Sequence, residues 1–108
     1  MILSIDTTKR EEVIVEIWEN KKQKDKIVVT QNPPSQALLP AIVKILKKNK
    51  IEFKHLTGVN VATGPGSFTG TRVGCAVANA MAFALKIPVN GKLDKIAEPI
   101  YEKTKYDL

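Results

Sequence analysis

Gly64-Pro65-Gly66-Ser67-Phe68-Thr69-Gly70-Thr71-Arg72-Val73-Gly74 is the stretch of the sequence that decides the fold. An apolar run over residues 59–62 precedes it, and an alanine-rich segment with apolar residues at helical spacing follows it as far as Leu85. We expect a β-strand, a glycine-rich turn and a long helix that ends before Pro88. A strand that feeds a helix through such a turn is a building unit of α/β sheets.

Three further strands are predicted upstream of this unit. Residues 2–6 form a short, mostly apolar run, and residues 12–18 are rich in β-branched side chains, so these two segments are expected to form a hairpin. A polar, lysine-rich turn over residues 20–25 then leads to a third strand at residues 26–30.

A first helix is predicted after Asn32-Pro33-Pro34, whose prolines force extended backbone. Ser35 is the expected N-cap, and Pro40 is expected in the first turn, where its missing N–H costs little. Apolar residues recur along one face of this helix, namely Leu38, Leu39, Ile42, Ile45 and Leu46.

Downstream, residues 87–89 predict a fifth strand, and residues 93–101 predict either a short helix or an irregular tail. The element order is therefore β-β-β-α-β-α-β. This order is typical of an α/β fold, the ribonuclease H-like, actin-like half-domain, in which helices pack on a mixed five-stranded sheet.

The second helix has almost no polar face between Arg72 and Lys86. A helix that is apolar all round must be covered on both sides, and a sheet covers one of them. The apolar stretch is too short to span a bilayer. The sequence therefore predicts that another surface covers this helix.

The length of 108 residues supports one hydrophobic core and no second lobe that closes over a substrate. One cysteine, Cys75, excludes an internal disulfide, and with one histidine, His55, no zinc site is expected. His55 is interpreted as a surface or capping residue. No signal peptide or membrane anchor is recognised, so a cytoplasmic location is expected.

The net charge of +6 comes mostly from two lysine clusters, Lys21-Lys22-Gln23-Lys24 with Lys26, and Lys44 with Lys47-Lys48-Asn49-Lys50. Neither cluster is interleaved with aromatic residues that stack on bases. Solvated turns and helix ends are the favoured interpretation, and a surface for RNA or an acidic partner is the alternative.

Asp6-Thr7-Thr8, at the expected carboxyl end of the first strand, is one candidate site, because a strand end projects a carboxylate into a cleft. A two-metal nuclease needs further acidic ligands, and residues 35–50 contain no Asp or Glu. No metal ligands and no catalytic residues are therefore predicted. An aspartate that bonds its own turn is the alternative interpretation.

The glycine-rich turn is the second candidate site, since N–H groups at a helix N-terminus form a cradle for anions. The pattern of a P-loop does not match. Tight packing of the strand on the helix is the alternative role. The candidate nucleotide or phosphate contacts are Asp6, Thr7, Thr8, Gly64, Gly66, Ser67, Gly70 and Arg72.

Three segments carry a resemblance to a known family: Met1-Ile-Leu-Ser-Ile-Asp-Thr-Thr, Ser35-Gln-Ala-Leu-Leu-Pro-Ala-Ile, and the glycine-rich stretch with its alanine-rich helix and Ile87-Pro-Val. Together they resemble the bacterial TsaB (YeaZ-like) proteins. The resemblance implies an actin-like, Hsp70-like ATPase-superfamily fold. It also implies a non-catalytic subunit of the complex that attaches threonylcarbamoyl to tRNA, beside a TsaD-type catalytic paralogue whose His-x-x-x-His motif this chain lacks.

The resemblance further implies that the first and second helices dock on the catalytic paralogue, with a homodimer through the same helices as the alternative. By position, the interface residues are Leu38, Leu39, Ile42, Val73, Val77, Ala80, Met81 and Ala84. A TsaE-type ATPase is the implied further partner, and tRNA is contacted only indirectly. Pro34 stands where the family usually has a histidine.

The same resemblance sets an expectation for cofactors. Family members normally carry a second domain, so residues 1–108 are expected to form a single N-terminal domain without it. Because the actin-type nucleotide site lies between two domains, no cofactor is expected on this chain alone, and ATP is expected only in the complex. The alternative function is a stand-alone nucleotide- or phosphate-binding protein that uses the turn at residues 64–70.

Overall fold

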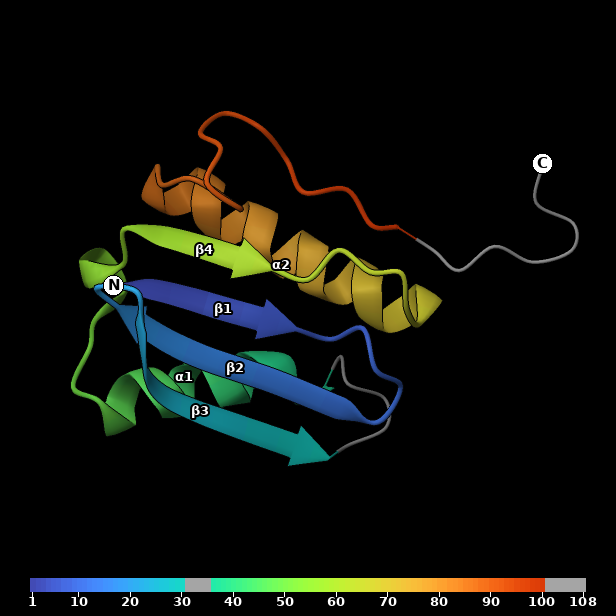
Figure 1. The fold of residues 1–108 in the computed structure, drawn as a ribbon, viewed down its shortest axis with the longest axis horizontal. Helices are drawn as coiled ribbons and strands as arrows, with labels where there is room; N and C mark the ends of the chain where they lie inside the picture. Colours follow the sequence, from blue (N-terminus) through green and yellow to red (C-terminus); the bar gives the residue numbers. More distant parts are fainter. Residues whose placement is uncertain (31–35, 101–108) are drawn as a thin grey trace, which may run out of the picture.

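The computed structural model describes residues 1–30 and 36–100 (Figure 1). One mixed sheet has the strand order β3-β2-β1-β4, formed by β1 (Ile2–Asp6), β2 (Glu12–Glu19), β3 (Lys22–Thr30) and β4 (Gly58–Val61). β1 pairs antiparallel with β2 and parallel with β4, and β2 pairs antiparallel with β3. The predicted α/β class and mixed sheet are confirmed.

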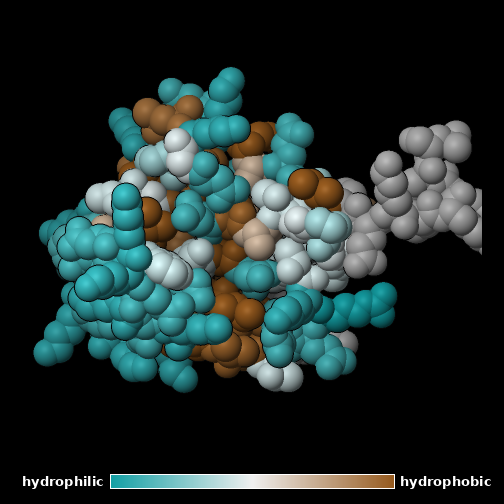
Figure 2. Space-filling view, viewed as in Figure 1, coloured by the Kyte–Doolittle hydropathy of each residue, from teal (hydrophilic) through white to brown (hydrophobic). Residues whose placement is uncertain are grey.

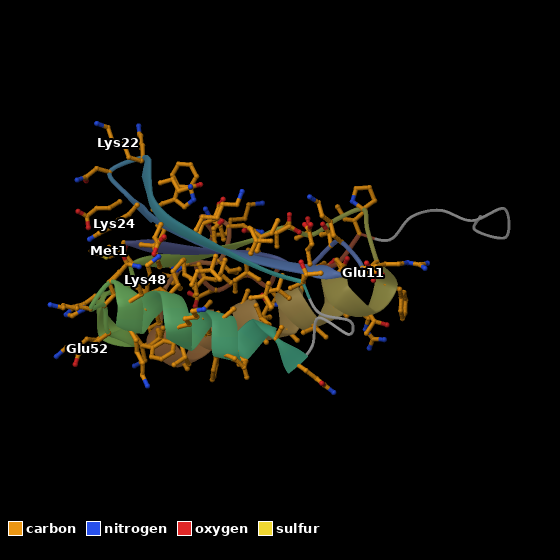
Figure 3. The ribbon with its side chains drawn as sticks, turned by 90° about the horizontal axis from the view of Figure 1, so that it is seen from below. Met1, Glu11, Lys22, Lys24, Lys48 and Glu52 are labelled. Carbon is orange, nitrogen blue, oxygen red and sulfur yellow. The ribbon has the colours of Figure 1, made fainter. Side chains whose placement is uncertain are left out.

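One face of the sheet is covered by helices. The side chains that face them alternate along the strands and are buried, namely Leu3, Ile5, Val13, Val15, Ile17, Val59 and Val61. Both helices lie on this face: α1 (Leu38–Lys48) packs on β2 and β3, whereas α2 (Phe68–Leu85) packs on β4 and β1 (Figures 1 and 3). The core therefore lies in a single layer between the sheet and its two helices.

The other face, which we call the open face, is not covered by either helix. It carries Ile2, Ser4, Ile14, Glu16, Trp18, Lys26, Val28 and Asn60. Figure 2 looks onto this face, where a hydrophobic band crosses the middle and hydrophilic residues cover the end that holds the β2–β3 turn. The antiparallel part of the sheet, β1 to β3, tolerates one solvated face.

α1 buries the apolar stripe that the sequence predicts, apart from one residue. Leu38, Ala41, Ile42, Ile45 and Leu46 are buried, whereas Leu39 is exposed. Pro40 lies in the first turn as predicted. The helix begins after Ala37, and the predicted N-cap, Ser35, lies outside the described residues.

α2 lies on the sheet through small residues. Gly70, Gly74, Ala78 and Ala82 are buried at four-residue spacing, so the helix comes close to β1 and β4. Its end before Pro88 is confirmed, since the helix stops at Leu85. Within residues 1–30 and 36–100, no helix combines the length and the apolarity that crossing a membrane needs.

The predicted turn over residues 20–25 is too long. Asn20 and Lys21 alone form the turn, with φ of 52° and 64°, and the strand begins at Lys22. Two residues with positive φ match the twist of a hairpin, and Asn adopts this conformation readily. The polar residues 22–26 extend β3 because they lie on an exposed edge strand.

The prediction of a fifth strand is wrong. Val89 makes isolated bridges, parallel to Val59 and antiparallel to Lys92. Asn90 and Gly91 have positive φ and turn the chain back at once, so the ladder does not continue. Residues 93–100 form the irregular tail that the sequence offered as one outcome, and Tyr101 lies outside the described residues.

Candidate functional site

Asp6 ends β1 and organises its own turn. Its Oδ1 accepts hydrogen bonds from the backbone N–H of Thr8 at 2.9 Å and from the Thr8 hydroxyl at 2.7 Å. This is the local bonding that the alternative interpretation of Asp6 predicts. The β1 end and the glycine-rich turn lie side by side, because the Ser67 N–H donates to the Thr8 carbonyl at 2.8 Å.

Thr7 is fully buried beneath the first turns of α2. Its hydroxyl donates to the Gly70 carbonyl. A Cβ atom at Gly70 would run into the Thr7 carbonyl, and one at Gly74 would run into the Thr7 hydroxyl. The two glycines therefore let α2 approach β1 more closely than any other residue allows.

Gly66 and Gly64 have separate reasons to be glycine. A Cβ at Gly66 would lie 2.6 Å from the Thr8 Cβ. Gly64 has a φ of +105°, and a Cβ there would meet the carbonyl of Ile100. The packing accounts for the glycines of this turn without a ligand, and contact with a nucleotide or phosphate stays a prediction.

The polar side chains near the glycine-rich turn, those of Ser67, Thr71 and Arg72, have different interaction partners. The Ser67 hydroxyl accepts a hydrogen bond from the Gly70 N–H at 3.4 Å and caps α2. Thr71 is fully buried, and its hydroxyl has no hydrogen-bond partner among residues 1–30 and 36–100. The exposed Arg72 places its guanidinium carbon 5.2 Å from the centre of the Phe68 ring.

His55 and Cys75, for which the sequence predicts no chemistry, have structural surroundings. His55 caps the short helix η2 (Phe53–His55), where its Nδ1 accepts from the Glu52 N–H at 3.0 Å, so the capping interpretation is confirmed. Cys75 is buried, and this burial raises the pKa of its thiol. Within residues 1–30 and 36–100, no cluster of three His, Cys, Asp or Glu side chains could hold a metal ion.

α2 presents an apolar surface away from the sheet. Its exposed residues, which we call the α2 outer face, are Phe68, Thr69, Arg72, Ala76, Ala80, Phe83 and Ala84. Phe83 is 88% exposed. Val73, Val77 and Met81 are partly buried at its borders. The sequence predicts that a second surface covers this helix, and the structure has an exposed apolar side of α2 where such a surface could pack.

A groove continues the α2 outer face beyond the end of the helix. It has a volume of about 820 Å³ and lies between the last turns of α2 and residues 93–96. Leu93 and Ile96 line it and are more than half exposed. The apolar surface therefore extends past Leu85.

The predicted interface residues divide into three groups by burial. Leu38 and Ile42 are fully buried against the sheet, so their placement on a partner surface is corrected. Leu39, Ala80 and Ala84 are exposed, and Val73, Val77 and Met81 are partly buried. On α1 the exposed apolar residues are Leu39 and Val43.

Comparison with known proteins gives a family. The sequence model of the family "TsaD: tRNA N6-adenosine threonylcarbamoyltransferase" matches residues 28–92, which is more than half of the chain. The chain belongs to the TsaD family. Within it, the similarity is to TsaB (YeaZ) proteins.

Two curated TsaB relatives illustrate this similarity, both named "tRNA threonylcarbamoyladenosine biosynthesis protein TsaB". That of Buchnera aphidicola subsp. Schizaphis graminum is 33% identical over 97% of this chain and 50% of its own length. That of Escherichia coli is 29% identical over 83% of this chain and 38% of its own length. The chain therefore spans half or less of the length of these relatives.

A solved structure supports the same similarity to TsaB (YeaZ) proteins. YeaZ from Pseudomonas aeruginosa is 27% identical and superposes with a TM-score of 0.75, over 82% of this chain and 42% of that protein. The predicted ribonuclease H-like, actin-like half-domain and the TsaB resemblance are confirmed, with four strands in place of five in the described residues.

The sequence prediction missed Phe68, Ala76 and Phe83 on the outer face of this TsaB-like chain. A signal was present: the small residues at positions 70, 74, 78 and 82 mark the side that lies on a sheet. Residues two positions away on the helix point the opposite way, which gives 72, 76, 80 and 84. The spacing of the small residues would therefore have indicated which side of the helix lies on the sheet and which side is exposed.

Proposed function

We propose that this chain acts in the biosynthesis of tRNA threonylcarbamoyladenosine as a non-catalytic subunit that docks on a TsaD-type catalytic paralogue. The names of its TsaB relatives support the pathway. The α2 outer face supports the docking role, and it is the observation that carries the proposal.

The composition of this face suits another helix. Ala76, Ala80 and Ala84 lie at four-residue spacing and let a partner helix approach closely. Phe83 at one end offers a large exposed aromatic ring of the kind that anchors interfaces. Burial of such apolar surface gains about 25 cal/mol per Å², whereas its exposure to water gains nothing.

The surroundings widen the docking surface. Leu39 and Val43 are exposed on α1, and Leu93 and Ile96 border the groove beside α2. Because a docking surface must be accessible, we revise the predicted interface according to exposure. It retains the exposed Leu39, Ala80 and Ala84 and gains Phe83. Three partly buried residues contribute through their accessible atoms, namely Val73, Val77 and Met81. When the paralogue is absent, the same surface pairs two copies of this chain.

The remaining features of the proposal follow from the pathway. The complex works in the cytoplasm, where tRNA is modified, together with a TsaE-type ATPase. ATP is bound by the assembled complex and not by this chain alone.

The test is assembly with the cognate paralogue. Size-exclusion chromatography with light scattering of the mixed proteins should show a heterodimer, and Ala80→Glu should abolish it because the new carboxylate would be desolvated. Gln23→Glu is the matched control, since it adds the same charge on the exposed β2–β3 hairpin. Failure of the unmodified chain to associate with an intact paralogue would refute the docking role.

A further inference from the structure

The fold brings the two lysine clusters of the sequence together at one end of the molecule. β3 starts at the turn of Asn20 and Lys21, and α1 runs back toward that turn and ends at Lys48. Lys22, Lys24 and Lys48 lie at the same end in Figure 3, opposite Glu11. We call this region the lysine end and define it by Lys21, Lys22, Lys24, Lys26, Lys44, Lys47, Lys48 and Lys50.

One carboxylate joins the two clusters. Asp25 of β3 accepts a hydrogen bond from the Asn49 amide at 2.8 Å and forms an ion pair with Lys48 at 3.4 Å. The same Asn49 amide donates to the Ile45 carbonyl at 2.8 Å. Hydrogen bonds from Asn49 and the Lys26 backbone lower the pKa of Asp25, so it is charged at neutral pH.

The other lysines of this end keep their charges unpaired. Among the described residues, Lys48 is the member of the lysine end that forms an ion pair, and the seven others form none. All eight are exposed. Glu19 and Glu16 lie opposite Lys22 and Lys26 in the β2–β3 register, and Asp25 pairs with Lys48. The eight lysines outnumber these carboxylates, so the lysine end has a net positive charge that attracts a polyanion.

A hollow beside the lysine end adds an aromatic surface. It opens on the open face with a volume of about 540 Å³. Its lining includes Trp18, Lys21 and the amino-terminal Met1, together with two carboxylates, Glu16 and Glu19. The Trp18 indole N–H donates to Glu16 Oε1 at 3.0 Å, which orients the ring and engages one oxygen of that carboxylate. An amphipathic ring held beside ammonium groups is the arrangement on which unpaired bases stack.

We propose that the lysine end and the Trp18 hollow bind RNA directly, with the ammonium groups on the phosphates and one unpaired base on Trp18. An acidic protein would satisfy the lysines but would leave the hollow unused. The choice of tRNA as the natural RNA rests on the proposed function, whereas the binding itself does not. This surface lies on a different part of the molecule from the α2 outer face.

The experiment titrates the isolated chain with a labelled tRNA transcript and follows fluorescence anisotropy at several salt concentrations. Trp18 is the single tryptophan of the chain, so its quenching reports the hollow directly. Lys22→Gln/Lys47→Gln removes one charge from each cluster and should weaken binding. It should also lower the slope of log Kd against log salt by about 1.4, or about 0.7 per lost phosphate contact.

A matched control removes two charges at the opposite end of the sheet. Lys9→Gln/Arg10→Gln lies beyond the end of β1 and should leave both affinity and salt slope unchanged. Trp18→Phe should retain binding through the smaller ring, and Trp18→Leu should weaken it at least about five-fold. Circular dichroism of each variant confirms that it is folded.

Three outcomes would overturn the proposal: no tRNA binding at low salt, equal losses in the two charge variants, or polyglutamate binding as tightly as tRNA without quenching Trp18. The last outcome would assign the lysine end to an acidic protein. None of them bears on the heterodimer, because the paralogue is absent from this experiment.

Discussion

The hydroxyl of Thr7 donates a hydrogen bond to the backbone carbonyl of Gly70, 63 residues further along the chain. Thr7 follows the last residue of β1, and Gly70 lies in the first turn of α2. This bond fastens the two segments of the candidate site to each other inside the core.

Loss of that bond should destabilise the protein. Thr7→Val keeps the shape of the side chain and removes the donor, so we expect a loss of about 1 kcal/mol in the free energy of unfolding. Urea denaturation measures it. Thr7→Ser keeps the hydroxyl and should retain the hydrogen-bond contribution, and a Val variant as stable as the wild type would contradict the role of this bond.

Thr71→Val should have the opposite sign. Thr71 is as buried as Thr7, but its hydroxyl has no hydrogen-bond partner in the described part of the chain. Replacing an unsatisfied hydroxyl with a methyl group should raise the free energy of unfolding by up to about 1 kcal/mol. The same urea experiment checks this, and a clear loss of stability would show that the hydroxyl is bonded in solution.

Gly70→Ala should destabilise the fold by about 1–3 kcal/mol, because the new methyl group would overlap the Thr7 carbonyl. Gly58→Ala is the control, since a Cβ there meets its nearest atoms at 3.7 Å, an ordinary contact. Thermal unfolding of both variants gives the comparison. Equal shifts in Tm would mean that the close approach of α2 is not the reason for Gly70.

Acid should weaken the link between β3 and α1 through Asp25. The folded state lowers the pKa of this carboxyl below its ordinary value of 3.8. Its contribution is therefore fully present above that value and is lost as the pH falls through the lower, folded pKa. In unfolding experiments between about pH 5 and pH 2, Asp25→Asn should show a shallower loss of stability than the wild type. Parallel curves would argue against the Asn49 contact.

Substitutions at Phe83 and Ile42 should distinguish an effect on partner binding from an effect on stability. Phe83→Ser changes a side chain that is 88% exposed, so the stability should shift by less than about 0.5 kcal/mol while binding of the paralogue weakens. Ile42→Ser opens the core and should cost more than about 3 kcal/mol. Calorimetry with the paralogue and urea denaturation provide the two readouts. Unchanged binding by the Phe83 variant would exclude this ring from the interface.

Local patterns predicted most of the fold. The β-branched run at residues 12–18, the apolar stripe of α1 and the glycine-rich turn before α2 each depend on neighbours in sequence, and each is found where it was expected. The prediction of a fifth strand was wrong because the three apolar residues at 87–89 match only the local pattern of a strand. A strand also needs a continuing ladder of hydrogen bonds, and Asn90 turns the chain away after the bridge to Val59.

The sites depend on contacts that no local pattern contains. Leu38 and Leu39 are adjacent and equally apolar, yet the sheet buries one and leaves the other exposed. Asp25 and Lys48 meet because α1 returns along β3, which unites two lysine clusters that are separate in sequence. The sequence therefore located the candidate residues, and the tertiary arrangement decided which of them share a surface.

β3 forms one edge of the sheet and exposes a row of backbone groups without a neighbouring strand in the described chain. Such an edge is a template on which a second molecule can extend the sheet toward a fibril. Lys22, Lys24 and Lys26 lie along this strand and repel an identical edge. The lysines proposed to attract RNA thus also oppose aggregation through this edge. A bound polyanion would neutralise these lysines, but it would also cover the edge strand and block its pairing with a second molecule.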